Sequence, residues 1–134
     1  MKIRNGFVSN SSSSSFIIRG MKISIDEAIK KLSISQEEID ECGEDEYELF
    51  ELVSGKFDGF NVEPDGNYFG EQDYSTLIVG EDAGRLEDGD VVELKEYTSE
   101  ENQAILEKFE KLGFDVWGMG KLRTFVQMVS NDNY

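Results

Sequence analysis

Two stretches of the chain repeat apolar residues at the spacing of an amphipathic helix. In the first, Ser24 has the position of an N-cap, and the apolar residues that follow are Ile25, Ala28, Ile29 and Leu32. In the second, Thr98 and Glu101 have the spacing of a capping box, and the apolar residues before Gly113 are Ala104, Ile105, Phe109 and Leu112. Each stretch predicts a helix with one buried face.

Between these two stretches the pattern predicts two further helices. Ser35 and Glu38 repeat the capping-box spacing, and Gly43 interrupts the pattern. A helix over residues 44–53 would end at Gly55 as its C-cap, and its inward side chains would be Tyr47, Leu49, Phe50 and Val53.

Short apolar runs separated by Gly, Asp and Asn predict strands. We expect them at 2–5 and 16–18, joined by a serine loop, near 60–62, at 76–79 and at 91–94. Residues 114–117 and 122–128 predict two antiparallel strands joined by a turn over 118–121, with Trp117 in the core. An exposed Trp117 would instead mark a partner site.

These elements predict an α+β fold, with one mainly antiparallel sheet and about three helices packed on it. The length of 134 residues fits a single domain spanning 1–134, with a serine-rich segment at 9–15.

Charge adds a strong bias to this picture. Asp and Glu number 29 against 13 Lys and Arg, for a formal net charge of -16. Such a surface repels nucleic acids and anionic membranes and attracts basic proteins, so we expect neither direct nucleic-acid binding nor membrane association. The absence of a signal-peptide h-region or of an apolar run near the ~20 residues that cross a bilayer predicts a cytoplasmic protein.

The acids are densest between Lys31 and Lys56, where no base occurs. On helices, these carboxylates would be spaced at about 5–6 Å, comparable to phosphates along a DNA strand. The predicted partner-binding residues are Glu37, Glu38, Asp40, Glu41, Glu44, Asp45 and Glu48. The alternative is a solvated acidic face that keeps the protein soluble.

The string Gly6-Phe7-Val8-Ser9-Asn10, followed by Ser11 to Ser15 and Phe16, resembles an N-terminal signature of small bacteriophage and bacterial proteins that largely lack an assigned function. The resemblance covers about the first eighteen residues. It implies a phage or mobile-element setting inside a host cell, and it implies no reaction.

The serine segment itself has three interpretations. It is a polar connection between strands, or a processing, assembly or modification signal, or an anion-binding loop. In the third case, the anion would be held by backbone N–H groups of the serines and by nearby bases, Lys22 among them. The predicted anion-site residues are Ser11, Ser12, Ser13, Arg4 and Arg19.

Catalytic and metal-binding chemistry finds little support. The chain has no His and a single cysteine, Cys42, whose acidic neighbours raise the pKa of a thiol. Residues 61–72 imitate a calcium loop, but Asn61 and Gln72 stand where acids are needed. We therefore predict no catalytic residue, no metal and no cofactor.

Three functions follow as hypotheses. The first is a non-enzymatic phage-type accessory protein whose acidic surface binds a basic host or phage protein, with DNA mimicry as the mechanism. The second is a virion- or assembly-associated protein that uses the serine segment. The third is a phosphate- or nucleotide-binding enzyme.

Overall fold

A four-stranded antiparallel sheet forms the centre of the molecule. The computed structural model describes residues 15–65, 67–68, 71–72, 74–88, 90–117 and 122–127. The sheet has the strand order β2 (Asn61–Pro64), β5 (Thr76–Asp82), β1 (Phe16–Ser24) and β8 (Arg123–Gln127). Every neighbouring pair is antiparallel. The predicted α+β class is confirmed.

Two short hairpins form two-stranded sheets of their own, outside the four-stranded sheet. One pairs β3 (Asn67–Tyr68) with β4 (Glu71–Gln72), and the other pairs β6 (Gly84–Glu87) with β7 (Asp90–Leu94). The strand expected at 91–94 is therefore confirmed as β7, but its partner β6 was not predicted.

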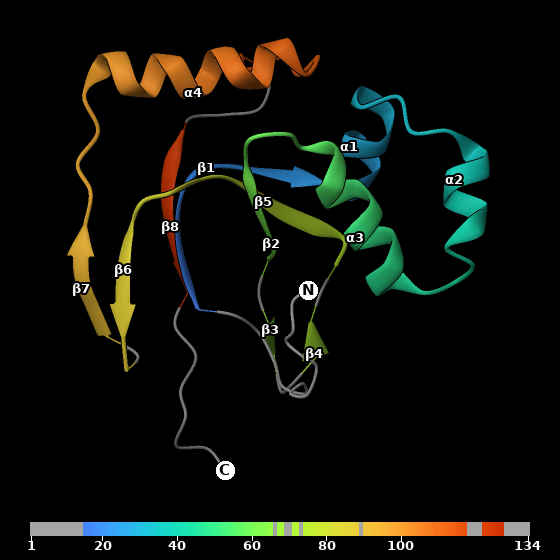
Figure 1. Cartoon of the computed structure of the whole chain (residues 1–134), viewed down its shortest axis with the longest axis horizontal. Helices are drawn as coiled ribbons and strands as arrows, with labels where there is room; N and C mark the ends of the chain where they lie inside the picture. The colour runs from blue at the N-terminus through green and yellow to red at the C-terminus, as the bar shows by residue number, and fades with distance from the viewer. Residues whose placement is uncertain are drawn as a thin grey trace.

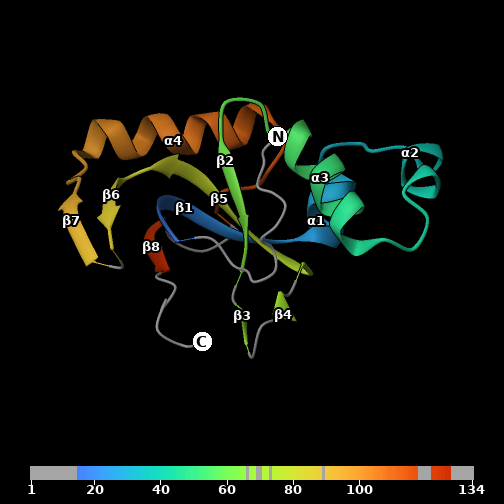
Figure 2. The ribbon, with the colours of Figure 1, turned by 60° about the horizontal axis from the view of Figure 1, so that its bottom comes forward.

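Four helices occur within the described ranges, and three of them have seven or more residues. They are α1 (Ile25–Lys31), α2 (Gln36–Glu41), α3 (Glu46–Lys56) and α4 (Ser99–Lys111). Helix α4 runs over the sheet, while α1, α2 and α3 gather at the end of the molecule away from the β6–β7 hairpin (Figure 1). Figure 2 shows the same separation from a second direction.

The main core joins one face of the sheet to α1, α3 and α4. Met21, Leu77 and Val79 of the sheet belong to the same buried cluster as Ile105 and Phe109 of α4. The Phe109 ring stacks on Phe60 at 4.5 Å between centroids. Burial of these side chains provides most of the stabilisation of α4, because a short helix is marginal in water by itself.

A smaller cluster lies on the other face of the sheet. Phe16 and Ile18 of β1 and Ile78 of β5 are buried there, with Phe125 of β8 packed against them. Alternate residues of a strand point to opposite faces, which places these side chains away from Met21 and Val79.

Close approach of β1 and β5 depends on a pair of glycines. Gly20 and Gly80 lie opposite each other in the register. A Cβ at either position would collide with the backbone of the other strand. A side chain is therefore excluded at both positions.

The sequence predicted one strand too short and another, at 114–117, that does not form. Strand β1 continues to Ser24, well beyond the predicted 16–18, and the expected strand at 2–5 lies outside the described residues. Residues 114–117 form turns rather than a strand, and β8 pairs with β1.

Trp117 is 89% exposed, so its predicted place in the core is wrong. Gly113 has φ 101°, a left-handed conformation that reverses the chain after α4. Phe114 and Val116 then enter the core. The backbone N–H of Trp117 donates to Asp115 Oδ1 at 3.0 Å, a local turn that leaves the indole outside.

The sequence predicted the N-caps of the helices correctly, but it misplaced the C-terminal end of α3. Ser24, Ser35 and Thr98 are the N-caps of α1, α2 and α4, as expected. Gly55 lies inside α3 rather than capping it, because the helix runs from Glu46 to Lys56.

Two side chains expected to face inward do not. Tyr47 is 44% exposed and packs edge-on to Tyr74 at 5.8 Å between ring centroids. Ala104 is also exposed, and Leu106 of the same helix packs on the core instead. An alanine contributes so little apolar area that the larger neighbour determines the buried face.

Candidate functional site

The predicted acidic residues all lie on α2, on the turn after it and on the first turn of α3. We call these seven residues the acidic surface: Glu37, Glu38, Asp40, Glu41, Glu44, Asp45 and Glu48. Six of them are exposed and Glu38 is half-buried. Helix α2 buries none of its residues. The capping box therefore starts α2, and the helix lies largely exposed to solvent.

Glu38 is committed to the structure. Its carboxylate accepts from the backbone N–H of Ser35 at 3.2 Å, which completes the capping box of α2. It also forms an ion pair with Lys56 Nζ at 2.9 Å, which links α2 to the end of α3. The hydrogen bond from Lys56, and then that from Ser35, lower the pKa of Glu38 below its ordinary value.

Asp40 and Asp45 also have local partners. Asp45 is the N-cap of α3, and its Oδ1 accepts from the backbone N–H of Tyr47 at 2.9 Å and of Glu48 at 3.3 Å. Asp40 Oδ1 accepts from the side-chain amide of Gln36 at 2.9 Å. These interactions orient the two carboxylates, and both residues remain exposed.

The remaining four carboxylates belong to Glu37, Glu41, Glu44 and Glu48, and each is exposed. No ion pair within the described part of the chain involves any of them. Lys56 is the base nearest in sequence after the block, and Glu38 already pairs with it. The structure therefore divides the predicted surface. Glu38 is neutralised by Lys56, Asp40 and Asp45 keep their charge but have neutral hydrogen-bond partners, and these four carboxylates have neither kind of partner among the described residues.

Cys42 lies among these acids, and they affect the pKa of its thiol. Partial burial raises the pKa of its thiol, and the charges of Glu48, Glu41, Asp45 and Glu38 raise it further. The sequence predicted the direction of this shift but named only the acids, whereas burial is the larger cause. The Sγ donates to the carbonyl oxygen of Glu38 at 3.6 Å. A thiol in this environment stays protonated at neutral pH and is a poor nucleophile.

The predicted anion site falls mostly outside the described residues. Ser11, Ser12, Ser13 and Arg4 lie in residues 1–14, which the structure does not describe. Arg19 is half-buried on β1, where Nε donates to Asn102 Oδ1 and a terminal nitrogen to Thr124 Oγ1, both at 3.1 Å. Lys22 pairs with Asp65 at 3.3 Å. Both bases therefore already have partners within the fold.

A polar network around Arg19 was not predicted from the sequence. Tyr97 lies between two cations, with Lys95 Nζ at 4.7 Å and the Arg19 guanidinium carbon at 5.7 Å from the ring centroid. The Tyr97 hydroxyl donates to the carbonyl oxygen of Asp82 at 3.3 Å. Partial burial raises the pKa of the Tyr97 phenol above its ordinary value.

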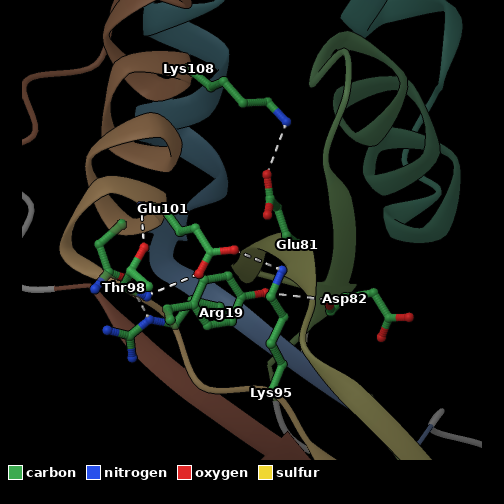
Figure 3. Close-up of polar contacts among 9 residues, drawn as sticks. Arg19, Glu81, Asp82, Lys95, Thr98, Glu101 and Lys108 are labelled. Atoms are coloured by element: carbon green, nitrogen blue, oxygen red, sulfur yellow. Dashed lines mark hydrogen bonds and ion pairs between the residues drawn. The ribbon is translucent and has the colours of Figure 1, made fainter.

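The same network connects α4 to the sheet (Figure 3). Glu101 pairs with Lys95 at 3.4 Å, and Lys108 pairs with Glu81 at 3.3 Å. Only the capping box of Thr98 and Glu101 gave a sequence signal for it, because the contacts that join α4 to the sheet are between residues far apart along the chain: Arg19 with Asn102, and Glu81 with Lys108. The network fixes α4 on the sheet through two ion pairs and through the hydrogen bond of Arg19 with Asn102.

Metal and membrane chemistry find no support in the part of the chain that the structure describes. No group of three or more His, Cys, Asp or Glu residues there is arranged to hold a metal ion. No helix there is long and apolar enough to cross a membrane.

Comparison with known proteins gives no further guide to the site. No protein-family model, curated protein or solved structure matches this chain.

Proposed function

We propose that this chain is a non-enzymatic accessory protein that binds a basic host or phage protein through its acidic surface, with the carboxylates taking the place of DNA phosphates. The phage setting comes from the resemblance of residues 6–16 to small phage proteins. The basic partner follows from the charge of the surface.

The observation that carries this proposal is the inequality among the seven acids. Glu38, Asp40 and Asp45 have intramolecular partners that fix the backbone of α2 and α3. The carboxylates of Glu37, Glu41, Glu44 and Glu48 are exposed and have neither an ion pair nor a hydrogen bond with described residues. A rigid support with unpaired charges is what preorganised recognition of a basic cleft requires.

A solvated face that only maintains solubility makes a different prediction. Solubility depends on the total charge, so it is indifferent to which acids are removed. A binding surface depends on the position of the charges. The two functions are therefore separated by variants of equal charge.

The test compares two fourfold variants of the full chain. E37Q/E41Q/E44Q/E48Q removes the four charges of the acidic surface whose carboxylates have neither an ion pair nor a hydrogen bond with described residues. The matched control D58N/E100Q/E107Q/E110Q removes the same number of charges from exposed positions elsewhere. Each tagged protein is used to capture proteins from a bacterial lysate, and bound proteins are challenged with duplex DNA and with salt.

We expect the wild type and the control to capture a DNA-binding protein that duplex DNA releases, and the acidic-surface variant to lose it. Raising the salt from about 50 to about 200 mM should weaken the capture strongly. Equal capture by both variants, capture that resists DNA and salt, or no basic protein in the captured set contradicts the proposal.

A further inference from the structure

Strand β7 carries three of the six large apolar side chains that are exposed in the described part of the chain. All five of its residues are exposed. Val91, Val92 and Leu94 are 41%, 45% and 54% exposed, although each is a residue type that usually lies in a core. Val92 and Leu94 are two residues apart and share a face of the strand, and exposed apolar side chains grouped in this way indicate a surface that is covered in use.

The hairpin that carries β7 is held firmly at its base. The backbone N–H of Ala83 donates to the carbonyl oxygen of Ile17 at 2.9 Å, and that of Lys95 donates to the carbonyl oxygen of Ala83 at 2.7 Å. Gly84 packs so closely on Glu93 and on the side chain of Ile17 that a Cβ would not fit. The hairpin is therefore a fixed extension of the fold.

One edge of β7 has no partner among the described residues. β7 pairs with β6 on one side only, and it is not part of the four-stranded sheet. It is the outermost described strand at its end of the molecule in Figures 1 and 2. An edge strand presents a row of backbone N–H and C=O groups that can pair with another extended chain.

The charge around this edge is negative. Within residues 84–96 there are five acids and two bases. Arg85 pairs with Glu87 and Glu93, and Lys95 pairs with Glu101. The other three acids are exposed and take part in no ion pair with described residues; they are Asp88, Asp90 and Glu96.

We propose that the outer edge of β7 binds an extended segment of another protein, with alternating apolar and basic side chains, by adding it as a strand to the hairpin. The backbone would supply the hydrogen bonds, Val91, Val92 and Leu94 the apolar contacts, and the acids the choice of a basic sequence. A second copy of this chain fits less well, because two molecules of net charge -16 repel each other.

This surface is separate from the acidic surface on α2 and α3, which lies at the other end of the molecule (Figure 1). Failure of either proposal leaves the other standing, because the variants that test them change different residues.

The probe is a capped, fluorescein-labelled peptide of four Lys-Val repeats, titrated with the full chain and followed by fluorescence anisotropy. Its matched control has the same sequence with N-methyl groups on two adjacent central residues, which removes hydrogen-bond donors and keeps the charge. We expect the unmodified peptide to bind about tenfold more tightly than the methylated one.

The protein variant V91T/V92T/L94T reduces the apolar surface of β7 while keeping the net charge and a high strand propensity. We expect it to bind the unmodified peptide about tenfold more weakly than the wild type. Val126→Thr is the control, because Val126 is an equally exposed valine on β8, the end strand of the main sheet. Its affinity for the peptide should equal that of the wild type.

Equal binding of the two peptides would reduce the interaction to charge attraction and overturn the proposal. The same conclusion follows if V91T/V92T/L94T binds as well as the wild type, or if Val126→Thr weakens binding as much. Analytical ultracentrifugation supplies a further check, since a dimer that the triple variant dissociates would assign the edge to a second copy. The peptide comparison uses wild-type protein and does not depend on how the variants fold.

Discussion

Helices α2 and α4 begin with the same motif and end in opposite environments. Ser35 with Glu38 and Thr98 with Glu101 form complete capping boxes, and in each case the glutamate also pairs with a lysine. Yet α4 buries Ile105 and Phe109 fully, whereas no residue of α2 is fully buried.

The difference shows that a capping box starts a helix, whereas the burial of its apolar residues determines whether the helix belongs to the core or lies exposed. α4 is held by core contacts and by the Arg19 network, so its sequence serves the fold. α2 is held by its cap, by the ion pair of Glu38 with Lys56 and by the partial burial of Ile39, so its exposed residues Glu37 and Glu41 have no part in packing. The proposed function places the binding surface on the second kind of helix.

Truncation of the apolar residue that each helix directs at the core should separate the two most strongly. Phe109→Ala removes a fully buried ring that stacks on Phe60, and it should cost about 3–5 kcal/mol of unfolding free energy. Ile39→Ala on α2 removes a half-buried side chain and should cost about 1 kcal/mol. Urea denaturation measures both. Equal costs would remove the distinction between the helices.

Loss of either cap should have a smaller and more similar effect. Thr98→Ala and Ser35→Ala each remove the side-chain acceptor for an N3 backbone N–H, at about 1 kcal/mol for the helix concerned. Since α2 has few core contacts, hydrogen exchange in Ser35→Ala should increase in α2 alone. In Thr98→Ala, the midpoint of global urea unfolding should fall. A fall in the midpoint of global urea unfolding in both variants would show that α2 is coupled to the core.

Acid should weaken both helix starts. Hydrogen bonds lower the folded-state pKa of Glu38, mainly from Lys56, and of Glu101, mainly from Thr98. A lowered folded pKa gives a stabilisation that is present above the unfolded value, near 4.3, and is lost as the pH falls through the folded value. Lys56→Met should therefore raise the pKa of Glu38 and leave that of Glu101 unchanged, as followed by carboxyl-carbon NMR titration. If the pKa of Glu38 did not change in Lys56→Met, the ion pair between α2 and α3 would not form in solution.

Removal of the unpaired charges should affect stability least. E37Q/E41Q/E44Q/E48Q takes away no intramolecular ion pair with described residues, and it relieves the like-charge contact of Glu37 and Glu41 at i and i+4 on α2. Its unfolding free energy should stay within about 0.5 kcal/mol of the wild type. A larger loss would mean that these acids have structural partners.

What the sequence revealed depended on the range of each interaction. The caps Ser24, Ser35 and Thr98 were predictable because their partners lie three residues away. The partner of β8 was not, because β1 is about a hundred residues distant and nothing local distinguishes it from residues 114–117. The exposure of Trp117 has a local cause instead, because the turn set by Gly113 and Asp115 overrides the apolar pattern around the tryptophan.

The candidate site shows the same division. The sequence located the seven acids and the acidic environment of Cys42, because they are close together along the chain. It did not show that Lys56 neutralises Glu38, or that β7 leaves its valines exposed, because both depend on how distant segments pack.

The salt dependence of partner binding tests the central claim most directly. For a basic protein captured by the wild type, the affinity is measured over a series of salt concentrations for the wild type, for E37Q/E41Q/E44Q/E48Q and for the equal-charge control D58N/E100Q/E107Q/E110Q. If the acidic surface takes the place of DNA phosphates, the slope of log affinity against log salt should become shallower only in the acidic-surface variant. Slopes that change equally in the two variants would show that total charge, and not this surface, attracts the partner.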